Sequence, residues 1–174
     1  MPTTGDDFDM GEELAAQADI HRDAYQRTID DARALAEERE EDGWETLVFP
    51  AGHTATEPPR VGETDRFGLV HVVPDNFADD FLEWFEPGRF PAFDVYRAEV
   101  SGRVFLVTEL LDPDERLAVI IIANYKLRDA QELIETVKEE EIMYTHLQRL
   151  DGTHLGSFEH EAYEKFFPEE ALLD

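Results

Sequence analysis

Apolar residues recur at helical spacing along the first quarter of the chain. Between residues 10 and 42 they return at steps of three, four or seven, with acidic residues and arginines between them, and Gly43 follows. This period is typical of an amphipathic helix, and a glycine just past the last apolar turn commonly ends one. The pattern predicts one long helix over 10–42. Its narrow, alanine-rich stripe, on which His21 also lies, consists of Leu14, Ala18, Tyr25, Ile29, Ala32 and Leu35.

The remainder of the chain is dominated by strand patterns. Short apolar runs bounded by glycine, proline and acidic turn residues are typical of strands. The run 116–124 is apolar on both faces and should be a central strand, and Asp151-Gly152 predicts a two-residue hairpin turn. The expected strands are 44–49, 67–73, 93–100, 103–111, 116–124, 142–150 and 153–159.

Three shorter helices complete the expected elements. Four aromatic residues at positions i, i+4, i+7 and i+8 predict a helix that Asp75 caps, and its aromatic face should belong to the core. Apolar spacing predicts further helices over 127–140 and 160–168. At 174 residues the chain is expected to form a single domain, 1–174. The predicted fold is α+β: a mainly antiparallel sheet with packed helices, formed by 44–174, and the long N-terminal helix.

The chain is strongly acidic. Its 42 Asp and Glu residues against 15 Lys and Arg give a formal charge of −27, although 42% of the residues are hydrophobic, which indicates a folded protein. Lysine is scarce and most of the basic residues are arginine. Dense carboxylates remain hydrated in concentrated salt, where a Debye length of about 3 Å at about 1 M screens their repulsion. The composition therefore indicates a halophilic protein and argues against nucleic acid as a partner.

The sequence carries no sign of a membrane or of an oxidising compartment. It has no cysteine, and its N-terminus lacks the basic and apolar regions of a signal peptide. The longest apolar run, 117–123, is far shorter than the roughly 20 residues of a membrane helix. We therefore expect a cytoplasmic protein with no membrane contact.

Motifs for catalysis, cofactors and metals are missing. The chain has no glycine-rich nucleotide loop, and neither Ser101 nor Ser157 lies in a nucleophile elbow. The two-residue turn would place His146 and His154 on opposite faces of the hairpin, so these residues and His160 are not expected to share a metal. The prediction is no metal, no cofactor and no catalytic residue.

The stretch 51–60, "AGHTATEPPR", is the best candidate for a ligand site. It is either a connecting loop or the wall of a ligand or partner site. Its prolines prevent the helix that a phosphate cradle would need. His71 alternates with apolar residues on one face of the next strand, which favours a core or interface position. The candidate ligand-binding residues are His53, Thr54, Arg60 and His71.

Several segments resemble an uncharacterised protein family of haloarchaea. The similarity extends over most of the chain from residue 20 onward. It implies a compact domain and a salt-rich cytosol, and it transfers no catalytic or binding residue. The segments that carry it are "EEDGWETLVFPAG", "FDVYRAEVSGRVFLVTELLDP", "NYKLRDAQEL" and "THLQRLDG" followed by "FEHE".

The leading functional hypothesis is a non-enzymatic binding or interaction protein. A regulatory protein would be one example of this class. The long helix is the expected interface, with a protein partner or a second copy of the chain. The alternative is a small enzyme acting on a phosphorylated or nucleic-acid substrate, with His53, His71 and Arg60 meeting in a cleft. A third hypothesis is a structural subunit of a larger assembly. The expected interface residues are Leu14, Ala18, His21, Tyr25, Ile29 and Leu35.

Overall fold

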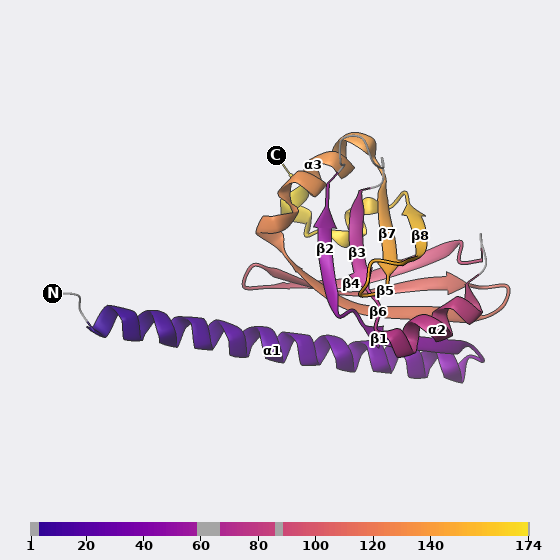
Figure 1. Cartoon of the computed structure of the whole chain (residues 1–174), viewed down its shortest axis with the longest axis horizontal. Helices are drawn as coiled ribbons and strands as arrows, with labels where there is room; N and C mark the ends of the chain where they lie inside the picture. Colours follow the sequence, from indigo (N-terminus) through magenta and orange to yellow (C-terminus); the bar gives the residue numbers. More distant parts are fainter. Residues whose placement is uncertain (1–3, 59–66, 86–88, 174) are drawn as a thin grey trace.

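The computed structural model describes residues 4–58, 67–85 and 89–173, and the side chains of the first helix from residue 12 onward. Figure 1 shows a long helix lying along a pair of stacked sheets. The predicted α+β fold with a long N-terminal helix is confirmed. Its helices are α1 (Thr4–Glu41), α2 (Asp75–Trp84) and α3 (Gln131–Glu140), with 3₁₀ turns η1 (Leu127–Ala130), η2 (Tyr163–Phe166) and η3 (Glu169–Leu172).

Eight strands form two mixed, four-stranded sheets in the described part of the chain. Sheet A has the order β1-β6-β5-β4, in which β1 runs parallel to β6 and the other pairs are antiparallel. Sheet B has the order β2-β3-β7-β8, with β3 parallel to β7. The strands are β1 (Glu45–Pro50), β2 (His53–Glu57), β3 (Gly68–Val72), β4 (Ala92–Val100), β5 (Arg103–Asp112), β6 (Leu117–Lys126), β7 (Met143–Gln148) and β8 (His154–His160).

Sheet A is covered on both faces, which explains its apolar strands. One face packs against α1 and the other packs against sheet B. In β6, Ile120 and Ile122 contact the α1 side, whereas Val119 and Ile121 belong to the core between the sheets. The predicted central position of this strand is confirmed.

Only part of α1 packs on sheet A. Small residues at steps of four, Ala24, Thr28, Ala32 and Ala36, are buried and allow the helix to lie close to the sheet. Residues 12–20 are exposed, and the N-terminal part of the helix extends past both sheets in Figure 1. The helix begins six residues before the predicted start and ends before Gly43, whose φ of 90° is left-handed.

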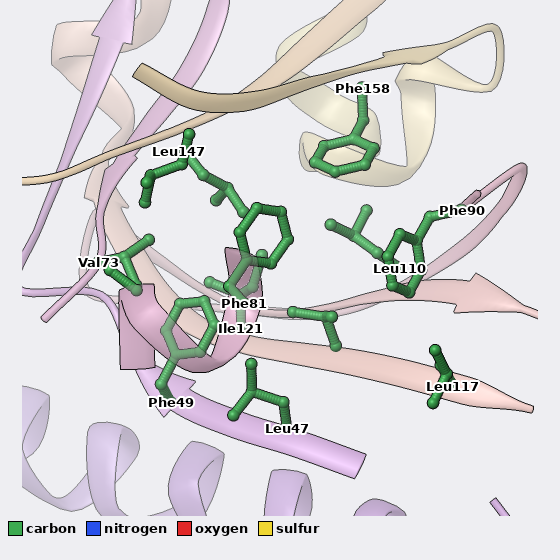
Figure 2. Packing of buried hydrophobic residues seen from close by; sticks show 13 residues of the cluster. Leu47, Phe49, Val73, Phe81, Phe90, Leu110, Leu117, Ile121, Leu147 and Phe158 are labelled. Carbon is green, nitrogen blue, oxygen red and sulfur yellow. The ribbon is translucent and has the colours of Figure 1, made fainter. Parts of the chain in front are cut away.

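The core between the sheets is rich in aromatic residues. In Figure 2, Phe49 and Phe81 belong to one cluster, with Leu147 and Phe158 of sheet B above them. Phe81 of α2 is fully buried, as expected for the aromatic face of that helix. Asp75 begins α2 but makes no capping hydrogen bond through its side chain, so the predicted cap is wrong. Pro74 occupies the capping position instead.

The stretch 51–60 is not a loop throughout. Residues 53–57 form the edge strand β2, which pairs antiparallel with β3 from His53 opposite Val72 to Glu57 opposite Gly68. Threonine suits a half-buried strand, and pairing with β3 outweighs the weak local signal. The interpretation of this part as a connecting loop is therefore wrong.

The hairpin of β7 and β8 also differs from its predicted register. The amide of Arg149 donates to the carbonyl of Thr153, which leaves a three-residue turn, and the ladder has an irregularity between Leu147 and Gln148. These two features place His154 on the same face as His146. Nδ1 of His146 and Nε2 of His154 each lie 2.7 Å from the hydroxyl oxygen of Ser157. The expectation of opposite faces is wrong.

A buried ion pair fixes α1 to sheet A. Glu109 of β5 has no exposed surface, and Arg39 of α1 donates to its two carboxylate oxygens, from Nε at 3.0 Å and Nη2 at 3.2 Å. The guanidinium also lies 4.8 Å from the ring centre of Trp44. The hydrogen bond with Glu109 raises the pKa of Arg39. This bidentate pair joins the C-terminal part of the helix to a central strand of the sheet.

Candidate ligand-binding cleft

Two adjoining hollows lie where the ends of β5 and β6 meet α1 and β2. The first has a volume of about 760 Å³ and lies between α1 and the end of sheet A. The second has a volume of about 390 Å³ and lies beside β2. Both are lined by Arg103 and Lys126. We call the two hollows together the basic cleft, defined by its cations Arg103, Lys126 and Arg128.

The strand register brings two of these cations together. Arg103 begins β5 and Lys126 ends β6, and the two residues lie directly opposite each other in the antiparallel ladder. Nη1 of Arg103 donates a hydrogen bond of 2.7 Å to the side-chain oxygen of Asn124. Like charges in opposed positions destabilise a strand pair. An anion between Arg103 and Lys126 would remove this repulsion.

Several cations in the described part of the chain have carboxylate partners there, whereas those of the basic cleft, like Arg27, Arg33, Arg97 and Arg116, have none. Arg39 pairs with Glu109, Arg149 with Asp79, and Lys165 with Asp94. In contrast, Arg103, Lys126 and Arg128 form no ion pair with any residue that the structure describes. Carboxylates are abundant in a chain of charge −27, so three unpaired cations in one hollow are informative. Asp129 lines the smaller hollow, and its carboxylate pairs with none of them.

The first helix forms one wall of the basic cleft. Leu14, Gln17 and Ala18 line the larger hollow on this side. Nε2 of His21 lies 3.1 Å from the carbonyl oxygen of Val100 and 3.2 Å from that of Ser101, so the imidazole fastens α1 to the β4–β5 turn. The apolar wall and the cationic floor give the hollow an amphipathic lining.

The six residues predicted for an interface separate into two groups. Leu14, Ala18 and His21 line the basic cleft. Tyr25, Ile29 and Leu35 are half-buried against the outer face of sheet A.

The four predicted ligand-binding residues also separate. His53 is exposed and lines the smaller hollow together with Thr54. Thr54 connects the cleft to the core, because its hydroxyl lies 2.8 Å from Nδ1 of His71. His71 is fully buried between the sheets, and Arg60 lies outside the described residues. Sequence reasoning missed Arg103 and Lys126, which line the smaller hollow together with His53, and Arg128, which lines the larger hollow.

The buried histidines serve the core rather than the cleft. Burial lowers the pKa of His71 to about 3 and the pKa of His160 to about 4, so both rings are neutral at ordinary pH. Nε2 of His160 lies 2.7 Å from the hydroxyl of Thr145. Within residues 4–58, 67–85 and 89–173, no group of three or more His, Cys, Asp or Glu side chains is arranged to hold a metal ion.

Comparison with known proteins identifies the family of the chain. Residues 11–168 match a family of unknown function (DUF7529), and the chain belongs to that family. No curated protein and no solved structure matches it. None of the described helices is long and apolar enough to cross a membrane.

The neutral state of His71 predicts an acid-sensitive fold. The unfolded chain binds a proton at this residue below about pH 6.5, but the folded chain cannot do so until about pH 3. The contribution of neutral His71 to the unfolding free energy is complete above the pKa of the unfolded state. Below that pKa, the contribution decreases by about 1.4 kcal/mol for each unit by which the pH falls. Between pH 6.5 and 5, the unfolding free energy of the wild type should therefore fall by roughly 2 kcal/mol more than that of His71→Gln. Urea titrations check this, and parallel pH profiles for the two proteins would contradict it.

Proposed function

We propose that the protein binds a small anionic molecule in the basic cleft. The observation that carries this proposal is the opposed pair Arg103 and Lys126, joined by Arg128, with no carboxylate partner in a chain of charge −27. Strand pairing places these like charges together at a cost that a bound anion removes. The larger hollow falls within the usual range of about 300–1,000 Å³ for ligand sites.

The ligand class follows from the side chains of the cleft. A guanidinium provides a planar fork of donors and an ammonium provides a compact point charge, a combination that suits phosphate or carboxylate groups. Leu14, Ala18 and Leu127 provide apolar contacts for an organic portion of the ligand. Nucleic acid fits poorly, because its long charged backbone would meet the acidic surface around the cleft.

The enzyme alternative uses the same binding step. His53 lines the smaller hollow with Arg103 and Lys126, so an imidazole is placed beside the proposed anion. General acid–base catalysis requires such a group within hydrogen-bond reach of the substrate. If ³¹P NMR shows that a phosphate ester stays intact during incubation with the protein, the result supports a binding protein. If it shows released phosphate, the result supports an enzyme.

The proposed setting is the salt-rich cytosol of a halophilic organism, with the resemblance to haloarchaeal proteins as support. Acidic residues cover the exposed face of α1, and the net charge of −27 needs screening. In such salt, long-range attraction is weak, so an anion site requires close and well-oriented donors.

Binding of pyrophosphate tests the proposed function. Calorimetry in about 2 M potassium chloride should detect binding to the wild type, because ion pairs in a partly enclosed cleft are screened much less than exposed ones. Arg103→Ala and Lys126→Ala should each weaken binding at least about tenfold, as expected for the loss of a charge-assisted hydrogen bond.

The matched control is Arg33→Ala, which removes the same charge from the exposed face of α1. This variant should retain wild-type affinity. Equal losses in all three variants would indicate a general charge effect, and undetectable binding to the wild type would refute the proposal.

Salt dependence tests the proposed setting. Circular dichroism should give a much lower melting temperature in about 0.1 M than in about 2 M potassium chloride, because dilute buffer leaves the carboxylates unscreened. Equal melting temperatures at the two concentrations would contradict a halophilic protein.

A second proposed role is a protein interface on α1, formed either with a second copy of the chain or with another protein. Leu14 is 65% exposed and Ile20 is 44% exposed, on a segment that packs on neither sheet along residues 12–20. Light scattering in high salt should show a dimer that Ile20→Glu dissociates, since burial of a charge at the contact is costly. Ile20 does not line the basic cleft, so pyrophosphate binding should persist in this variant. A monomeric wild-type protein would contradict this role.

A further inference from the structure

A separate hollow opens along the other side of the sandwich. It has a volume of about 470 Å³ and lies between β4, an edge strand of sheet A, and β8, an edge strand of sheet B. It shares no lining residue with the basic cleft. We call it the aromatic pocket, because Phe85, Phe90, Phe93 and Phe158 line it.

The aromatic walls hold one another in position. The ring of Phe158 meets Phe85 and Phe90 edge to face, with centroid distances of 5.9 and 6.3 Å. Figure 2 shows Phe158 of β8 on one side, with Phe90 and Leu110 facing it from the side of sheet A. Edge-to-face packing favours a fixed arrangement of rings. These rings form a preformed apolar part of the pocket, whose lining also includes the polar residues Arg89, Ser157 and Glu159.

One polar atom of the lining lacks a partner. His160 lines the pocket, is 1% exposed, and packs against the rings of both Phe93 and Phe166, at centroid distances of 4.2 and 4.8 Å. Its Nε2 is paired with the hydroxyl of Thr145, but Nδ1 has no hydrogen-bond partner among the described residues. A buried polar atom without a partner destabilises the folded state. A ligand atom that reaches Nδ1 would remove this destabilisation.

The charge of the pocket favours a neutral ligand. Burial keeps the imidazole of His160 neutral, since its pKa is lowered to about 4. Arg89 lines the same pocket, but its guanidinium is paired with Asp112 at 3.6 Å and donates to the carbonyl of Trp84. Its charge is thus already compensated, unlike the charges of the basic cleft, and the carboxylate of Glu159, an exposed lining residue, disfavours an anionic ligand.

We propose that the aromatic pocket binds a small, neutral, planar molecule that presents one hydroxyl or carbonyl group to Nδ1 of His160. The ring of the ligand packs among the phenylalanines, and its single polar group satisfies the imidazole. Either kind of group fits, because the hydroxyl of Thr145 can donate to Nε2 or accept from it, which leaves Nδ1 as donor or acceptor. This proposal does not depend on the anion site.

A pair of matched probes tests the proposal on the full chain. p-Cresol and toluene have nearly the same shape, and only p-cresol carries a hydroxyl. In NMR titrations of the wild type, p-cresol should shift the side-chain resonances of Phe158 and His160. It should bind roughly threefold to tenfold more tightly than toluene, the ratio expected for one neutral hydrogen bond.

Variants on the same strand provide the controls. His160→Phe removes the imidazole and should reduce p-cresol affinity to that of toluene, whereas His154→Phe changes an exposed residue of β8 and should leave the ratio unchanged. Should His160→Phe fail to fold, the comparison of the two probes on the wild type decides alone. Equal affinities, shifts located elsewhere, or no binding up to the solubility of p-cresol would overturn the proposal.

Discussion

The buried ion pair between Arg39 and Glu109 is the interaction on which the arrangement of α1 depends. Glu109 lies in a central strand and has no exposed surface, so its charge is tolerated only because the guanidinium meets both carboxylate oxygens. The pair anchors the C-terminal end of the helix, and His21 fastens it again at the β4–β5 turn. Between these two points, small residues keep the helix close to sheet A. The wall of the basic cleft is therefore held both by an ion pair near the opposite end of the helix and by His21 within the cleft itself.

The acidic composition gives the unpaired cations their meaning. With 42 acidic residues, most positions near a basic side chain could hold a carboxylate, and several cations of the core and surface have one. Arg103 and Lys126 instead face each other across a ladder. A pair of like charges in opposed positions is understandable when the site is completed by an anion. In the aromatic pocket on the other side, by contrast, the lining cation Arg89 is paired with Asp112.

Strong periodic signals predicted most of the fold. The long helix follows from its sustained apolar stripe, and the central position of β6 follows from a strand that is apolar on both faces. Strand β2 could not be predicted, because "HTATE" lacks apolar alternation and forms only through pairing with β3. The cations of the cleft were missed for a related reason. The predicted strands 103–111 and 116–124 are already expected to pair. Arg103 lies opposite Lys126, however, only because β6 continues for two residues beyond its predicted end, and the helix wall of the cleft comes from another part of the chain.

The most direct test of the anion site is the position of a heavy anion in a crystal. Tungstate is a tetrahedral dianion that resembles phosphate and scatters anomalously, so its location can be read from a difference map. If the basic cleft is an anion site, the strongest peak should lie between Arg103, Lys126 and Arg128. A map with tungstate at exposed arginines of α1, such as Arg27 or Arg33, and none in the basic cleft would contradict it.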